Sequence, residues 1–234
     1  MYGMFISAPF GNYIKSKNAT SVTGTWTLKP RPGRVLQILK TLRWTTDGWT
    51  NKLGLRNPGI IKAISNHKDN EVLSIASIDR GDWGKLYNLI PKTYSVELNL
   101  SCPNVTNTTD GVRQSGIYKW APLFLNNKRK WLICKVSPLI TEREIDYLIN
   151  LGFPHIHASN TLPIEDGGLS GKLLIPHTLR ILEYTKKHYP LTTFIAGGGI
   201  TTKDDIKMYK NAGADYVSIG SVCFNVFKLN KLLN

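Results

Sequence analysis

Short apolar runs alternate with longer amphipathic stretches along this chain, and this alternation constrains its fold more than any other feature. The runs are predicted strands, and they cover Gly3–Ala8, Ser21–Trp26, Glu71–Ile78, Tyr94–Leu100, Lys130–Val136, His155–Ser159, Thr192–Ala196 and Asp215–Ile219. The intervening stretches predict helices near Asp82–Ile90, Ser115–Asn127, Thr141–Leu151, Pro176–Tyr189, Thr202–Ala212 and Val222–Leu233. Strict alternation indicates a parallel sheet covered by helices, and eight strands indicate a closed one. We therefore predict an α/β protein, a compact (β/α)8 TIM barrel that forms a single domain over residues 1–234.

The connection between the first two predicted strands is unusually short. Only the residues from Pro9 to Thr20 separate them, whereas a parallel crossover usually takes at least a dozen residues and includes a helix. We expect that the first helix is either lost or reduced to a single turn. Residues 29–55, which include Pro30 and Pro32, are predicted to leave the barrel and pass over its mouth.

Positive charge is concentrated in the first third of the chain. The whole chain has a net charge of +14, and residues 1–70 hold eleven Lys and Arg against Asp47 and Asp69 alone, a net charge of +9. Such a field attracts anions, whether a phosphate cofactor, a carboxylate substrate, a nucleic acid or an acidic lipid. A solvated basic surface is the simpler interpretation, and nucleic acid is disfavoured because no aromatic and basic repeat of a nucleic-acid module is present.

The three cysteines, Cys102, Cys134 and Cys223, are far apart in the sequence. They form no Cys-x-x-Cys pair, and no histidine cluster has metal-ligand spacing, so we expect a reducing compartment and no metal site. No apolar run is long enough to span a bilayer, and the first residues lack the basic start of a signal peptide. The sequence therefore predicts a cytoplasmic protein without a membrane segment.

The hexapeptide Asn99-Leu100-Ser101-Cys102-Pro103-Asn104 ends the fourth predicted strand and places two amides and a thiol at its exit. Pro103 restricts the backbone at its own position and at Cys102, so the thiol lies on a stiff turn. A stiff thiol between amides suits proton abstraction from a planar polar ring. The alternative is a turn that contains a buried cysteine of no chemical importance.

Further polar groups follow the neighbouring strands. In a parallel barrel the carboxyl ends of the strands form the active face, so Lys135, Asn160 and Thr161 should meet the hexapeptide there. Glycine clusters at 167–171, 197–200 and 220–221 complete this face, and the last two follow the seventh and eighth strands, where this fold binds phosphate. We expect His155 and His157 to face opposite sides of one strand, with one of them a structural histidine.

These motifs together resemble the dihydroorotate dehydrogenase family of flavin barrels in pyrimidine biosynthesis. The matching segments lie in family order, and they are Thr23 to Thr27 with Pro30 and Pro32-Gly33, Asn51 to Gly59, Glu97 to Asn104, Ala158 to Thr161, Gly167 to Gly171, Gly197 to Ile200, and Gly220-Ser221. Seven motifs in order are far more specific than any one of them. A cysteine at position 102 resembles the soluble first class of the family rather than the membrane-bound quinone-using class.

The resemblance implies an FMN-dependent oxidation of dihydroorotate to orotate on the way to UMP. Cys102 would be the base that removes the C5 proton, and a hydride would pass from C6 to the flavin N5. Asn51, Asn99, Asn104, Asn160 and Thr161 would hold the substrate. The implied FMN contacts are Ala8, Thr25, Asn99, Lys135, Gly168, Gly171, Gly198, Gly199, Gly220 and Ser221, and Lys135 would offset negative charge on the reduced flavin.

The chain departs from the family pattern at several loops. Arg34-Val35-Leu36 replaces the usual Asn-Pro-x-Pro-Arg, Gly24 stands where some members have a flavin-contacting lysine, and the segment between Asn160 and Gly167 is short. Two alternatives therefore remain, namely a related barrel that reduces uracil in RNA and a degenerate basic barrel without activity. The electron acceptor is left open, and a homodimer is one assembly that the sequence allows.

Overall fold

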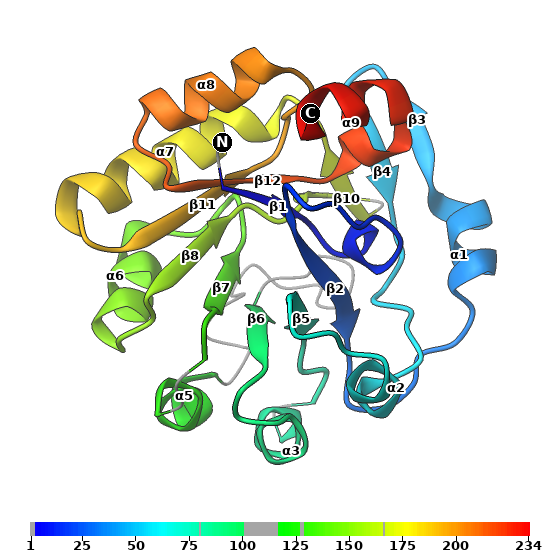
Figure 1. Ribbon diagram of the computed structural model, residues 1–234, viewed down its shortest axis with the longest axis vertical. Helices are drawn as coiled ribbons and strands as arrows, with labels where there is room; N and C mark the ends of the chain where they lie inside the picture. Colours follow the sequence, from blue (N-terminus) through cyan, green and yellow to red (C-terminus); the bar gives the residue numbers. More distant parts are fainter. Residues whose placement is uncertain (1–2, 80, 101–116, 127–128, 166) are drawn as a thin grey trace.

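Eight parallel strands form a closed barrel in the computed structural model, which describes residues 3–79, 81–100, 117–126, 129–165 and 167–234. The barrel strands are β1 (Met4–Ile6), β2 (Thr20–Trp26), β5 (Glu71–Ile75), β6 (Ser95–Asn99), β7 (Leu132–Val136), β8 (His155–Ala158), β11 (Thr193–Gly197) and β12 (Tyr216–Ile219). They pair in chain order around the ring, and β12 closes it against β1 (Figure 1). The predicted (β/α)8 TIM barrel is confirmed.

Helices surround this barrel, as expected from the alternation in the sequence (Figure 1). They are α2 (Ile60–Ser65), α3 (Asp82–Leu89), α5 (Ile117–Leu125), α6 (Glu142–Asn150), α7 (Leu174–His188), α8 (Lys203–Asn211) and α9 (Val226–Leu233). Two 3-10 helices, η1 (Phe10–Asn12) and η2 (Ser221–Phe224), follow β1 and β12. Within the described ranges, no helix combines the length and apolar character needed to cross a bilayer.

The connection between β1 and β2 contains a single helical turn, η1. This is one of the two alternatives expected from the sequence, the other being complete loss of the first helix. The turn η1 packs directly on β2, because a Cβ atom at Gly11 would lie only 2.2 Å from the carbonyl oxygen of Val22. This close contact requires glycine and explains how so short a connection covers the barrel. Asn12 fixes the turn further, since its Oδ1 accepts a hydrogen bond from the amide of Gly24 at 3.0 Å.

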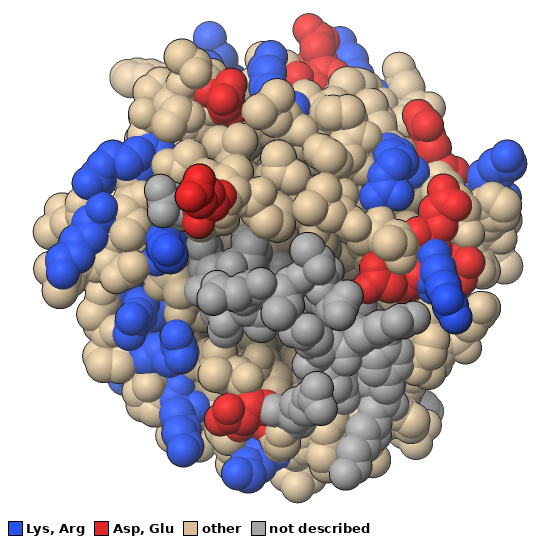
Figure 2. Space-filling model, turned by 180° about the vertical axis from the view of Figure 1, so that it is seen from behind, with Lys and Arg blue, Asp and Glu red and all other residues tan. Residues whose placement is uncertain are grey.

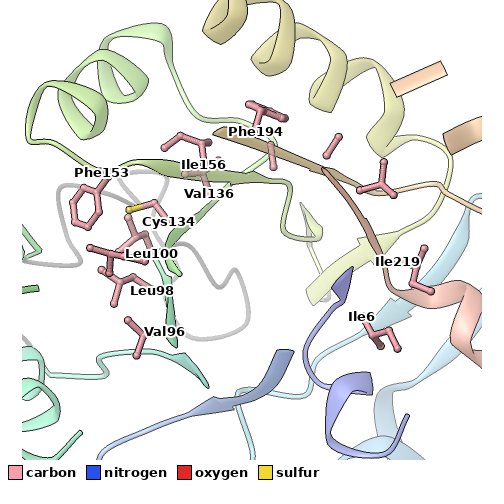
Figure 3. Packing of buried hydrophobic residues seen from close by; sticks show 14 of the residues in the cluster. Ile6, Val96, Leu98, Leu100, Cys134, Val136, Phe153, Ile156, Phe194 and Ile219 are labelled. Atoms are coloured by element: carbon pink, nitrogen blue, oxygen red, sulfur yellow. The ribbon is translucent and has the colours of Figure 1, made fainter. Parts of the chain in front are cut away.

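Alternate residues of the barrel strands face the helices and the barrel interior. Figure 3 shows Leu98, Cys134 and Ile156 together on the outer side of the strands, close to Phe153. Burial of each large aliphatic side chain there stabilises the fold by roughly 1.5–3 kcal/mol. The inward positions form a second, smaller apolar cluster at the amino end of the strands, made of Phe5, Val22, Val72, Ile133 and Ile195.

A second sheet lies beside the barrel mouth, and the sequence did not predict it. Its strands are β3 (Arg43–Thr45), β4 (Gly48–Asn51), β9 (Leu162–Ile164) and β10 (Gly167–Ser170), in the antiparallel order β3-β4-β10-β9. The predicted excursion over residues 29–55 thus contains β3, β4 and the helix α1 (Arg34–Thr41). Gly48 allows β4 and β10 to meet, since a Cβ there would lie 2.1 Å from the carbonyl oxygen of Ser170.

Candidate active site

A cavity of about 470 Å³ opens at the carboxyl ends of the barrel strands. Its floor comes from the strand ends and from the turns that follow them, and α1 and the small sheet supply part of its wall. Twelve of the residues predicted from the sequence line it, and they are Ala8, Thr25, Asn51, Asn99, Lys135, Asn160, Thr161, Gly171, Gly198, Gly199, Gly220 and Ser221. The fold thus brings together residues that lie more than 200 positions apart.

Among the predicted residues that the structure describes, Gly168 alone does not line this cavity. Gly168 lies in β10, opposite Asn51 of β4, and its place is in the small sheet rather than at the cavity wall. Cys102 and Asn104 lie outside the described residues. The strand that precedes them, β6, ends at Asn99 on the cavity floor.

The cavity floor contains a connected row of amides and hydroxyls. Asn160 Nδ2 donates to Asn99 Oδ1 at 2.9 Å, and Asn99 Nδ2 donates to Thr25 Oγ1 at 3.0 Å. The backbone amide of Thr161 in turn donates to Asn160 Oδ1 at 3.1 Å. These bonds orient both side-chain amides, so the floor offers fixed donors and acceptors to a planar polar ring.

Lys135 is buried inside the barrel, beside Asn99 on the neighbouring strand. The sequence suggested that this lysine points at an anion, and the structure provides one in the protein itself, Glu97, which is fully buried one layer below. Burial alone would raise the pKa of Glu97, but the ammonium of Lys135 and hydrogen bonds from His157 and Ser74 lower it to about 2. Glu97 is therefore ionised at neutral pH.

His157 completes this buried group. Its Nδ1 lies 2.7 Å from Glu97 Oε2, and burial lowers the pKa of its ring although Glu97 acts in the opposite direction. The expectation that His155 and His157 face opposite sides is wrong, because residues two positions apart share one face of a strand. Both lie on the interior side, in register with Ile133 and Lys135 of β7.

Glycine turns after β11 and β12 border the cavity as the sequence predicts. Gly198 and Gly199 adopt positive φ angles of 98° and 74°, and a Cβ at Gly198 would lie 2.7 Å from Leu174 Cβ. At Gly220 the space is instead open, since a Cβ would meet no atom closer than Ser7 Cβ at 4.0 Å. These turns line the cavity at the place where other barrels of this type bind phosphate.

An aromatic cluster forms one wall of the cavity, and the sequence did not assign it to the site. Phe224 lies between Phe10 and Trp49, with ring centroids 5.0 and 4.5 Å away, and Trp44 extends the row from Trp49 at 5.3 Å. Phe10, Trp49 and Phe224 line the cavity directly. The tryptophans near residue 49 were the available signal, but their distance in sequence from Phe224 hid the contact.

Basic residues gather at the edge of the mouth. Figure 2 shows Lys and Arg side chains along the edge that carries α1 and α2, whereas Asp and Glu occur more densely on the opposite edge. Arg34 and Arg56 line the cavity, and Arg34 also donates to the Tyr13 hydroxyl at 2.9 Å. A cationic entrance of this kind raises the local concentration of anionic ligands. Within the described ranges, no cluster of His, Cys, Asp and Glu could hold a metal ion.

Comparisons with known proteins agree with this geometry. The family model described as dihydroorotate dehydrogenase matches residues 8–232. The catalytic subunit of dihydroorotate dehydrogenase B (NAD(+)) from Thermotoga petrophila is 32% identical, over 93% of this chain and 88% of that protein. Dihydroorotate dehydrogenase A (fumarate) from Lactiplantibacillus plantarum is 25% identical, over 94% and 77%.

A solved structure shares the fold. DHODH in complex with ferulenol from Eimeria tenella superposes with a TM-score of 0.72 at 20% sequence identity, over 98% of this chain and 79% of that one. This likeness supports the barrel architecture, and the sequence matches support the family. The chain therefore belongs to the dihydroorotate dehydrogenase family of oxidoreductases.

Proposed function

We propose that this protein oxidises dihydroorotate to orotate in UMP biosynthesis, with FMN as cofactor, as one catalytic domain. The observation that carries the proposal is the oriented pair Asn99 and Asn160 beside buried Lys135, in a cavity bordered by two glycine turns. Relatives named for this reaction, one with NAD(+) and one with fumarate, support it.

The substrate chemistry matches the floor of the cavity. Dihydroorotate presents ring carbonyls, ring N–H groups and a carboxylate, and the amides of Asn51, Asn99 and Asn160 offer the complementary donors and acceptors. Arg34 and Arg56 at the mouth favour entry of the carboxylate. We propose that Thr161 holds the substrate from the loop after β8, together with Asn104.

The residues present fit FMN. Gly198, Gly199, Gly220 and Ser221 line the cavity where its phosphate would lie, and the lack of a side chain at Gly220 keeps the cavity open there. Ala8, Thr25, Asn99 and Gly171 would contact its ring system or ribityl chain, and Lys135 would place a cation near it. When bound, FMN supplies the acceptor for the hydride from C6 of dihydroorotate.

We propose Cys102 as the base that takes the C5 proton, on the strength of its motif. The other two cysteines are poor candidates. Cys134 is buried among apolar side chains, and burial raises its pKa well above its usual range. Cys223 lines the cavity, but burial raises its pKa to about 12, so it remains a thiol at neutral pH.

The test is an anaerobic titration of the purified protein with dihydroorotate. We expect a yellow protein whose flavin absorbance bleaches, and a colourless protein that cannot be reconstituted with FMN would refute the proposal. Cys102→Ala should bind FMN but lose at least about a hundredfold in the rate of flavin reduction, the usual scale for removal of a general base. Cys223→Ala is the matched control, and it should reduce its flavin at a rate close to that of the unmodified protein.

Reoxidation identifies the electron acceptor. After reduction with dihydroorotate, fumarate, NAD(+) and a quinone are added separately under anaerobic conditions, and the return of flavin absorbance is followed. The acceptor that restores the absorbance fastest defines the class of the enzyme. Reduction of uracil in a tRNA, with binding that weakens steeply as salt rises, would instead favour the RNA-directed alternative.

A further inference from the structure

A hydrogen-bonded chain of side chains runs from the barrel interior to the cavity floor. It contains six residues in the order His157, Glu97, Ser74, Thr25, Asn99 and Asn160, with successive distances of 2.7, 2.7, 3.0, 3.0 and 2.9 Å. Five of the six are buried, and they come from four different strands. Only the last three line the cavity, so a ligand there does not touch the group formed by Glu97 and His157.

The charge of Glu97 fixes the direction of every bond in this chain. An ionised carboxylate only accepts, so the single hydroxyl proton of Ser74 points at Glu97 Oε1. Ser74 must then accept from Thr25, and Thr25, whose own proton is used, must accept from Asn99. The inventory of protons leaves no other arrangement while Glu97 remains charged.

The same argument fixes the orientation of the side-chain amides of Asn99 and Asn160 on the floor. Because Asn99 Nδ2 faces Thr25, its Oδ1 faces Asn160, whose Nδ2 donates to it. The second N–H of Asn99 donates to no residue in the described part of the chain, and because Asn99 lines the cavity, this N–H is available as a donor to a ligand there. A ligand that places a carbonyl or carboxylate oxygen at this point is favoured over one that places an N–H group there.

His157 stabilises the negative charge of Glu97. Its Nδ1 donates to Glu97 Oε2, so the neutral ring carries its proton on Nδ1 and a lone pair on Nε2. That Nε2 lies beneath Gly197, since a Cβ there would be 3.2 Å from it. Glu97 therefore has a donor on each carboxylate oxygen and Lys135 nearby, which keeps a fully buried carboxylate ionised.

We propose that Glu97 and His157 are positioning residues that set the polarity of the cavity floor and thereby its selectivity for a ring with an acceptor oxygen over Asn99. This inference rests on the proposed function, because orotate and dihydroorotate are rings of that kind. Neither residue touches the ligand. They act through Ser74 and Thr25 on the orientation of the Asn99 amide.

Two variants test the chain at different links. Glu97→Gln keeps the shape but can donate to Ser74, which allows the bonds to reverse, and Ser74→Ala removes the link while it leaves Glu97 and His157 in contact. Both should weaken orotate binding on the order of tenfold or more, measured from the change in flavin absorbance, while FMN content is retained. Glu71→Gln is the control, since Glu71 is also buried in a barrel strand, paired with Lys15 away from the cavity.

Orotate affinity that stays unchanged in Ser74→Ala would overturn the proposal, even if Glu97→Gln failed to fold. An equal loss in Glu71→Gln would also overturn it, because the effect would then be one of general stability. A wild-type protein that binds FMN but not orotate would contradict the proposed function instead.

The tautomer of His157 provides a test that needs no ligand. In the ¹⁵N spectrum of histidine-labelled protein at neutral pH, we expect a neutral His157 ring protonated on Nδ1, assigned by the loss of its signals in His157→Gln. His155, whose Nδ1 donates to the carbonyl oxygen of Leu132 at 2.9 Å, should give a second such ring, which His157→Gln retains. A His157 ring protonated on Nε2, or on both nitrogens, would overturn the positioning role whatever the result with orotate. The Nδ1-protonated form, with Ser74→Ala weakened for orotate, would support it.

Discussion

The floor of the cavity and its cover, which consists of α1 and the small sheet, are built in opposite ways. Directly beneath the floor, Glu97 and Ser74 are completely buried, and each carboxylate oxygen of Glu97 has a hydrogen-bond donor. On the cover, α1 has no buried residue, and Val35, Leu39 and Trp44 are 72%, 70% and 67% exposed. The floor is held by the register of eight strands, whereas α1 is held by hydrogen bonds to nearby residues, such as that from Gln37 to the carbonyl oxygen of Lys52. The side chains of the floor are therefore positioned independently of the cover.

Part of the apolar face of α1 is exposed to solvent. Ile38 of α1 and Leu42, the residue that follows this helix, line the cavity. Val35, Leu36 and Leu39 extend the same apolar face into solvent. Arg43 closes the end of this helix by donating to the carbonyl oxygens of Leu39, Lys40 and Leu42. Along its length, Gln37 and Thr41 connect the helix to Lys52 through hydrogen bonds of 2.6 and 3.0 Å.

The largest expected effect lies on the floor. Glu97→Ala removes the acceptor for Ser74 and His157 and leaves Lys135 buried without its countercharge. We expect it to lower the free energy of unfolding by about 3–5 kcal/mol, the usual cost of breaking a buried charge group on one side. Urea denaturation measures this loss. A change below about 1 kcal/mol would show that the interior chain does not stabilise the barrel.

The second largest expected effect is a loss of unfolding free energy at acid pH. The pKa of Glu97 is about 2 in the folded protein, below the ordinary value of 4.5, so its contribution is present above pH 4.5 and lost as the pH falls toward 2. This difference corresponds to about 3 kcal/mol. His157 acts in the same direction from pH 6.5 downward, because its pKa is lowered and the unfolded chain binds the proton more readily.

The measurement is the free energy of unfolding of wild type and Glu97→Gln between pH 7 and pH 2.5. The wild type should lose its advantage over the variant as the pH falls below 4.5. Parallel curves for the two proteins would contradict an ionised Glu97, since other groups with lowered pKa values, such as Asp205, are common to both.

Substitutions at two glycine turns should have different effects, one on stability and the other on FMN binding. At Gly198 the positive φ of 98° and the 2.7 Å approach to Leu174 make Gly198→Ala strained, with an expected loss of about 1–2 kcal/mol in unfolding free energy. At Gly220 a Cβ has space, so Gly220→Ala should cost little stability but weaken FMN binding severalfold by entering the cavity. Flavin fluorescence on dilution measures the second effect. Equal FMN affinity in Gly220→Ala and wild type would remove Gly220 from the phosphate site.

The sequence predicted the floor better than the cover, for physical reasons. Eight barrel strands carry enough apolar residues to be recognised, and each predicted run overlaps a strand of the barrel. The strands of the small sheet have three or four residues, with glycine at Gly48 and Gly167, and show no alternation. Their pairing depends on a contact between segments about 120 residues apart, which local patterns do not contain.

The buried partners of Lys135 escaped prediction for a related reason. A strand reveals which of its residues share a face, but not which residue of another strand lies beside them. Glu97 and His157 are adjacent only because β6, β7 and β8 have the register observed, with Asn99 beside Lys135 and Lys135 beside His157. The amides of Asn99 and Asn160 were predicted because their motif positions, at strand exits, already place them at the mouth.

The smallest expected effect lies on the outer face of α1. Leu39→Gln replaces an exposed leucine with another good helix former, so the free energy of unfolding should change by less than about 0.5 kcal/mol. Ile38→Gln, one residue away, places an amide in the apolar cavity wall and should weaken FMN or orotate binding measurably. If Leu39→Gln destabilised the protein as much as Glu97→Ala, α1 would have to be packed against something on its outer face. The contrast between floor and cover would then be wrong, because the cover would be as firmly held as the floor.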